Sequence, residues 1–210
     1  MDANQPPEAC QNRRNIVPVA IILLMGILYT VLDYIQPAEP WLSLLAFLPG
    51  VISFIILRLG GDSLLVLRLR FDKLSFTGLL TLGATSILLL PILASSTSWI
   101  GWHWLPALVY APASGIAQEL YFRAALLPGL ERVIDNRKTI ALFIHSALFV
   151  GFHYRTFQAI PTLAIGLVVA VVLFFAGCGW GWQVQRDRTV FWAMLHHSTF
   201  LVLMSMFEWS

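Results

Sequence analysis

The sequence predicts an all-α protein, a polytopic bundle of about seven transmembrane helices with its N-terminus in the cytoplasm and its C-terminus outside. Three observations support this fold class. Of 210 residues, 58% are hydrophobic and only 11% are charged, far from the balance of a soluble domain. Long apolar runs, each near the length that crosses a bilayer, are separated by short polar segments. The basic residues fall on alternate connecting segments.

The first apolar run is predicted to be a retained membrane helix. It follows a polar cytoplasmic tail, residues 1–15, and begins a single integral membrane domain, residues 16–210. A cleaved signal peptide is the competing interpretation, but the run has about 20 residues and no small-x-small site follows it. The expected spans, in chain order, are Ile16–Ile35, Trp41–Leu57, Thr77–Ala94, Trp104–Leu130, Thr139–Phe157, Pro161–Ala176 and Val190–Met206.

The segments between the spans have characters of their own. Gly60–Ser75 mixes leucines with charged residues, which indicates a segment lying at the membrane surface. The segment before the fourth span carries three tryptophans, Trp99, Trp102 and Trp104, typical of the interfacial aromatic belt. A lid that lines a substrate site is the alternative for this tryptophan-rich segment.

The positive charges give the orientation. With seven spans, 11 of the 13 Lys and Arg residues lie on one side of the membrane. The other side holds only Arg155, and Arg123 lies within a span. The positive-inside rule therefore places the N-terminus in the cytoplasm and the C-terminus outside.

Composition also excludes several classes. A net charge of +2 offers no basic surface for nucleic acid. The two cysteines, Cys10 and Cys178, lie in different segments without metal-ligand spacing, so we expect no disulfide framework. We expect no cofactor, and the bilayer is an obligatory partner.

Glu119 and Arg123 are the unusual residues of the fourth span, because ionisable side chains are expensive within a membrane. They are four residues apart with the acid first, so they face each other on a helix and neutralise one another. One interpretation is a purely structural ion pair. The other is that Glu119 takes part in chemistry.

Histidines on two other spans bear on this choice. The fifth span carries His145 and His153, and the seventh carries His196 and His197. A single buried histidine usually has a packing role, but a carboxylate with neutral imidazoles can hold and deprotonate a water molecule. The same groups are also zinc ligands. The sequence has no HExxH helix, so we expect no metal.

These residues carry a resemblance to a known family. The run Gln118-Glu119-x-x-x-Arg123, then Phe149-x-x-x-His153, then a histidine in the last span, resembles the CAAX protease and bacteriocin-processing (CPBP, Abi) family of glutamic-type intramembrane proteases. The resemblance covers about residues 75–205. It implies that a glutamate and His153 activate a water molecule, and that a histidine of the last span stabilises the oxyanion. Arg123 would hold the motif helix in place.

Two positions depart from the family pattern. The first motif usually begins with two glutamates, and Gln118 stands at the first of them. Glu119 must then activate the water, or the protein is inactive. The last motif usually has Asn or Asp four residues after its histidine, whereas Phe200 and Leu201 follow His196 and His197 at that spacing. The choice between His196 and His197 stays open, with the position relative to Arg188-Thr189 slightly favouring His197.

The resemblance leads to an expected function. We expect an endopeptidase that cleaves near the C-terminus of a membrane-associated or exported protein, with that protein as its partner, in a bacterial inner membrane. The alternatives are a catalytically inactive member that binds a membrane peptide, for example an immunity protein, and a transporter. For Glu119 to reach His153, we also expect a helix break at Pro106–Gly115 and a cavity that opens outward.

Overall fold

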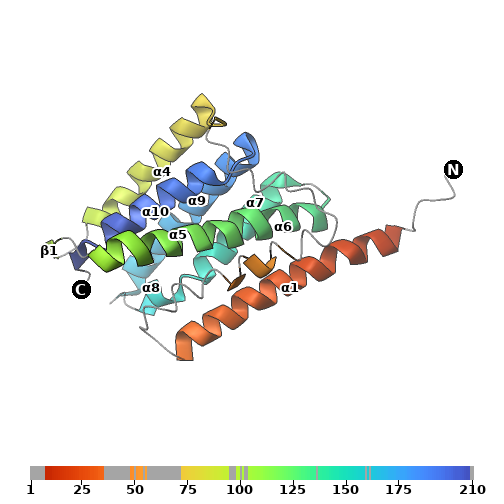
Figure 1. Cartoon of the computed structure of the whole chain (residues 1–210), viewed down its shortest axis with the longest axis horizontal. Coiled ribbons are helices and arrows are strands. Elements are labelled where there is room, and N and C mark those ends of the chain that lie inside the picture. The colour runs from red at the N-terminus through yellow and green to blue at the C-terminus, as the bar shows by residue number, and fades with distance from the viewer. Residues whose placement is uncertain are drawn as a thin grey trace.

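The protein is a bundle of helices, described here from a computed structural model (Figure 1). The structure describes residues 8–35, 48–49, 51–53, 55, 72–94, 98–99, 101, 104–135, 137–158, 160 and 162–208. The α-helices are α1 (Glu8–Ile35), α4 (Phe76–Ala94), α5 (Ala111–Glu119), α6 (Leu127–Val133), α7 (Lys138–Gly151), α8 (Tyr154–Gln158), α9 (Leu163–Asp187) and α10 (Phe191–Met204). Two π-helical segments, η2 (Pro106–Tyr110) and η3 (Leu120–Leu126), flank α5.

The helices pack in a simple order. The element from η2 to α6 is one long helix, shown in green in Figure 1, and α5 packs along α10. Helix α1 lies against α6 and η3, and α9 packs between α7 and α4. The two-residue strands β1 (Ser98–Trp99) and β2 (Phe207–Glu208) pair antiparallel.

Polar contacts mark the two ends of the bundle. At one end Arg186 Nε donates to Ser75 Oγ over 3.3 Å, and Gln185 Nε2 donates to Glu131 Oε1 over 2.7 Å. At the other end the β1–β2 pair joins the chain after α4 to the chain after α10. Successive long helices from α4 to α10 therefore alternate in direction.

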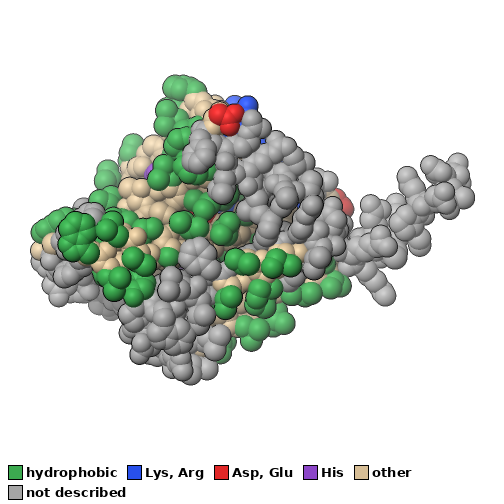
Figure 2. All heavy atoms as spheres, in the orientation of Figure 1, with side chains coloured by type: hydrophobic (Ala, Val, Ile, Leu, Met, Phe, Trp, Pro, Cys, Tyr) green, Lys and Arg blue, Asp and Glu red, His purple; other side chains and the backbone are tan. Residues whose placement is uncertain are grey.

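Two described helices, within Phe76–Leu93 and Leu163–Asp187, are long and apolar enough to cross a membrane. Shorter apolar helices are Ile16–Val31, Lys138–Gly151 and Phe191–Met204. Large apolar side chains such as Ile87 and Val168 are exposed on these helices. Hydrophobic side chains also cover much of the coloured part of the face in Figure 2, with charged side chains at its upper edge.

The fourth predicted span contains no helix break, so that prediction was wrong. The backbone stays helical from Trp104 to Val133. Pro106 lies in the first turn of this helix, where a missing N–H costs little, and Pro112 comes directly after the π-helical turn η2. The π-helical register accommodates them without ending the helix.

The boundaries of the fifth and sixth spans also differ from those predicted. Helix α7 ends at Gly151, and a turn at residues 152–153 separates it from α8. Helix α9 begins after its N-cap Thr162, whose hydroxyl accepts from the Ile165 N–H. It continues eleven residues beyond the predicted end at Ala176, to Asp187, because its glycines are packing points rather than an end. A Cβ at Gly181 would lie 2.5 Å from Leu142 Cδ1 of α7.

Some predictions lie outside the described residues. These are most of the span Trp41–Leu57, most of the surface segment Gly60–Ser75, and Trp102 of the tryptophan-rich segment. In the described part, α1 already begins at Glu8, within the predicted tail.

Candidate functional site

Gln118, Glu119 and Arg123 lie where the long central helix changes register. Glu119 is the last residue of α5, and η3 begins at the next residue. From Tyr121 to Leu126 every side chain of η3 is buried, so this part of the helix is surrounded by protein. Short π-helical insertions frequently occur at functional sites.

Glu119 forms the centre of a buried charged group. Arg123 Nη1 donates to Glu119 Oε1 over 2.8 Å, as the spacing of the two residues predicts. His197 Nδ1 lies 2.8 Å from the same oxygen, and a carboxylate is only an acceptor, so this nitrogen donates. Glu119 and Arg123 are fully buried and His197 nearly so. Glu119 Oε2 is buried without a hydrogen-bond partner.

Gly115 makes the contact with His197 possible. A Cβ at this position would lie 2.6 Å from Ser198 Oγ and 2.8 Å from Ser198 Cα, so α5 and α10 approach closely only because residue 115 has no side chain. Ser198 Oγ also donates to the Pro112 carbonyl over 3.4 Å. The close approach brings His197, the residue directly before Ser198, onto the Glu119 carboxylate.

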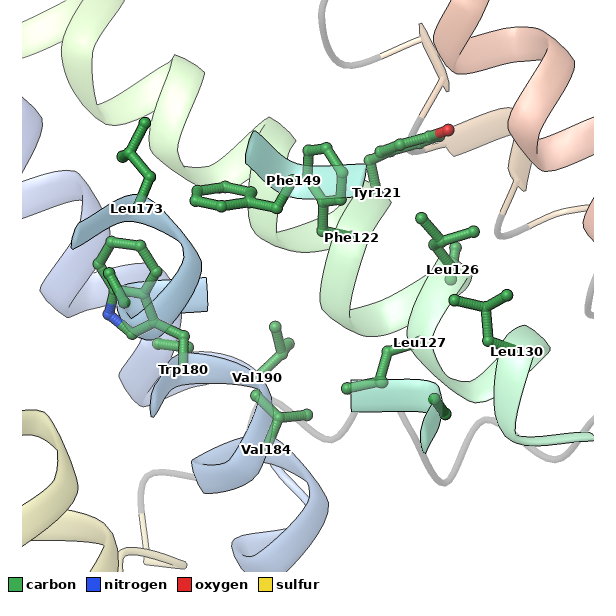
Figure 3. Packing of buried hydrophobic residues seen from close by; sticks show 14 of the residues in the cluster. Tyr121, Phe122, Leu126, Leu127, Leu130, Phe149, Leu173, Trp180, Val184 and Val190 are labelled. Carbon is green, nitrogen blue, oxygen red and sulfur yellow. The ribbon is translucent and has the colours of Figure 1, made fainter. Parts of the chain in front are cut away.

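Aromatic rings enclose the Arg123 guanidinium. Its Cζ lies 4.2 Å from the centroid of Phe149 and 5.2 Å from that of Trp180. Rings at these distances attract a cation through their quadrupole. Figure 3 shows Phe149, Phe122 and Trp180 in the buried core, and the Phe122 and Phe149 centroids are 5.1 Å apart.

The two adjacent histidines of α10 lie in different surroundings. His196 Nδ1 accepts from Trp180 Nε1 over 2.9 Å, so its Nε2 carries the proton and donates to Ser86 Oγ over 2.7 Å. His196 thus faces α4, whereas His197 faces Glu119. The structure therefore brings His197, and not His196, to the motif helix.

A cavity of about 280 Å³ lies beside the buried charged group, and the two remaining polar motif residues, Gln118 and His153, line it. Its lining includes Gln118 and His153, together with residues of α1 and α8. Gln118 Nε2 donates to Ser114 Oγ over 3.1 Å, and Gln118 Oε1 is buried without a partner. His153 Nδ1 donates to the Phe149 carbonyl over 2.7 Å, which leaves Nε2 as the acceptor nitrogen of a neutral ring.

Glu119 is not among the cavity-lining residues, nor is His197. Neighbours on a helix point about 100° apart, which is why Gln118 faces the cavity while Glu119 faces α10. The structure thus pairs Gln118 with His153 in one cavity and Glu119 with His197 and Arg123 in one buried group. Among the described residues, no three His, Cys, Asp or Glu side chains group as metal ligands.

Trp180 is a site residue that sequence reasoning missed. Its ring stacks on His197 at 4.4 Å and 20°, and its N–H fixes His196. The available signal was the pattern of Gly177, Gly179 and Gly181 around a large aromatic residue, which indicates a helix face that packs closely against its neighbours.

These features define a class of protein, an integral-membrane helix bundle with a buried Glu–Arg–His group beside a polar cavity. The family described as type II CAAX prenyl endopeptidase Rce1-like matches residues 98–203. The match spans about half of the chain and includes every motif residue above, so the chain belongs to this family of membrane-embedded CAAX-type proteases. Neither a curated protein nor a solved structure matches the chain.

Proposed function

We propose that the protein is an intramembrane endopeptidase that cleaves a peptide bond near the C-terminus of a membrane-associated or exported protein. In this proposal it spans a bacterial inner membrane seven times, with its N-terminus in the cytoplasm. The observation that carries the proposal is that Gln118 and His153 line the same cavity. His153 donates to the Phe149 carbonyl through Nδ1, so Nε2 is left as the acceptor nitrogen of its ring.

His153 is the proposed general base. A base must lie within hydrogen-bond reach of the proton that it removes, and in this proposal the attacking water molecule lies in the cavity beside Nε2. The water oxygen attacks the scissile carbonyl carbon while its proton passes to His153. The proton then passes to the leaving amide nitrogen as the C–N bond breaks, giving a carboxylic acid and an amine.

Gln118 and Glu119 have different parts in this scheme. An amide cannot take the proton of water, but Gln118 Oε1 accepts a hydrogen bond and so orients the water or a substrate N–H. Glu119 is a positioning residue that holds His197 and Arg123. Its role as a second base stays a prediction that rests on the unpartnered Oε2.

The test is a cleavage assay with the full chain in lipid. The candidate substrates are exported proteins with a C-terminal membrane tail that are encoded beside the gene of this chain, and mass spectrometry locates the cut. We expect His153→Ala to abolish product while the folded protein persists. His196→Gln, which alters the histidine facing α4, should reduce activity far less. Full activity of His153→Ala would reject His153 as the base.

A catalytically inactive, peptide-binding member is the second candidate, for example an immunity protein. The observation that favours it is the amide of Gln118 in the cavity, at the position where the family motif has a glutamate. Under this alternative the same tailed proteins co-purify with the chain uncut, and His153→Ala changes neither their binding nor their length.

A further inference from the structure

The cavity is closed on one side by a helix outside the family match. Gly26, Tyr29 and Thr30 of α1 line it together with Gln118 and His153, whereas the family match begins only at residue 98. Resting on the proposed function, we propose that Tyr29 and Thr30 form the subsite for the substrate segment beside the scissile bond, and that this segment is an extended, uncharged peptide.

Two tyrosine hydroxyls fix α1 at this place. Tyr121 Oη donates to the Ile22 carbonyl over 2.9 Å, and Tyr154 Oη donates to the Thr30 carbonyl over 3.4 Å. Figure 3 shows the Tyr121 hydroxyl directed away from the core that contains Phe149 and Trp180. The two anchored carbonyls are about two helical turns apart, so the α1 wall of the cavity is held at both of its ends.

Gly26 sets the distance between this wall and the motif helix. A Cβ at Gly26 would collide with the Tyr121 hydroxyl and would lie 2.8 Å from Phe152 Cζ. The absence of a side chain at residue 26 therefore lets α1 approach Tyr121 and Phe152. Tyr29 and Thr30 follow within about one turn, where they border the cavity.

The lining chemistry suits a peptide backbone. An extended segment within a membrane has N–H and C=O groups without internal partners, which is costly unless protein groups satisfy them. The hydroxyls of Thr30, Tyr121 and Tyr154 already donate within the protein, so toward a peptide they act as acceptors for its N–H groups. The described lining residues include no Lys, Arg, Asp or Glu, and the hydroxyl-bearing ones are Tyr29, Thr30, Ser114, Tyr121, Tyr154 and Thr156.

Photo-crosslinking of the full chain in nanodiscs tests the subsite. The probe is a short peptide of Ala, Val, Ser and Thr with a central benzoylphenylalanine, and two further probes carry Glu or Lys beside that residue. We expect the neutral probe to crosslink within residues 26–30 and 153–156. Tyr29→Phe and Thr30→Val should each lower its yield about fivefold, the effect of one typical hydrogen bond.

Thr81→Val is the matched control. The Thr81 hydroxyl donates to the Thr77 carbonyl as the Thr30 hydroxyl donates to the Gly26 carbonyl, but Thr81 lies on α4 and is not among the residues that line the cavity. Its crosslinking yield should match the wild type. Equal yields for Thr30→Val, Tyr29→Phe and Thr81→Val, or a preference for the Glu or Lys probe, would overturn the subsite.

Crosslinking needs no turnover, so the two proposals fail separately. Crosslinks on α1 without hydrolysis of any tailed protein would reject the peptidase and keep the subsite. Hydrolysis that is unchanged in Tyr29→Phe and Thr30→Val, together with unchanged crosslinking, would reject the subsite and keep the peptidase.

Discussion

His197 Nδ1 donates to Glu119 Oε1 over 2.8 Å, although 78 positions separate the two residues. The same carboxylate oxygen accepts from Arg123 Nη1. This group joins α5 and η3 to α10 through a buried charge. Removing a member of such a group leaves an uncompensated charge, which is more costly than the net contribution of the intact pair.

Arg123→Ala should therefore act on stability before it acts on chemistry. Glu119 would stay fully buried with only His197 as a partner, and breaking a buried ion pair typically costs about 3–5 kcal/mol. We expect little folded protein in membranes and a lower Tm in detergent. Lys73→Ala, which removes an exposed cation, is the control and should accumulate normally. Normal accumulation of Arg123→Ala would show that the pair contributes little.

Gly115→Ala should separate α5 from α10. The new methyl would lie within 3 Å of three atoms of Ser198, two of them backbone, so the helices must move apart. Overpacking of this kind costs about 1–3 kcal/mol, and we expect reduced activity because His197 would withdraw from Glu119. Gly83→Ala has nothing within 4 Å of the new Cβ and should be neutral or slightly stabilising. Thermal unfolding of both variants measures the difference.

Gln118→Glu should raise the rate of cleavage. It places a carboxylate in the cavity of His153, where it can take the proton of water, which the native amide cannot do. We expect a higher kcat that still depends on His153, so the double variant with His153→Ala should be inactive. A Gln118→Glu protein slower than wild type would indicate that the amide, as a donor or acceptor, is required at this position.

Chelators should leave cleavage unchanged. The proposed mechanism uses His153, Gln118 and Glu119 without a metal ion, so treatment with a strong zinc chelator and dialysis should not alter the rate. Measurement before and after chelation, with a zinc protease as the positive control, decides the matter. Loss of activity that returns on addition of zinc would overturn the proposed mechanism.

The Glu119–Arg123 contact was predictable from the sequence because it depends only on helical spacing. The proximity of His197 to Glu119 was not, because it depends on how closely α5 approaches α10. That distance is set by Gly115, a residue whose absent side chain gives no signal until its neighbour Ser198 is known. The cavity pairing of Gln118 with His153 likewise follows from the rotation of each helix about its axis, which sequence periodicity did not determine.

The helix boundaries also depend on packing between helices, which the sequence alone does not show. Proline positions and a presumed need to bring Glu119 to His153 led to the prediction of a break at Pro106–Gly115, but a π-helical register accommodates the prolines without one. The predicted end at Ala176 was wrong, because α9 continues through Gly177, Gly179 and Gly181 to Asp187, and tertiary packing overrides the low helix propensity of glycine. Gly179 packs against Thr85 and Gly181 packs against Leu142, so the propensity cost is offset by contact between helices.

The last prediction concerns the orientation of the bundle. In the seven-span arrangement, positions 14 and 135 face the cytoplasm, and positions 98 and 208 face outward. Single cysteines at these positions, in a chain without Cys10 and Cys178, should react with an impermeant reagent on intact cells only at 98 and 208. The remaining two should react after permeabilisation. Because Ser98 pairs with Glu208 in the β1–β2 ladder, these two positions must label alike in any orientation. Labelling of 98 without 208 would contradict the ladder itself, whereas equal labelling of 14 and 208 on intact cells would reject an odd number of spans.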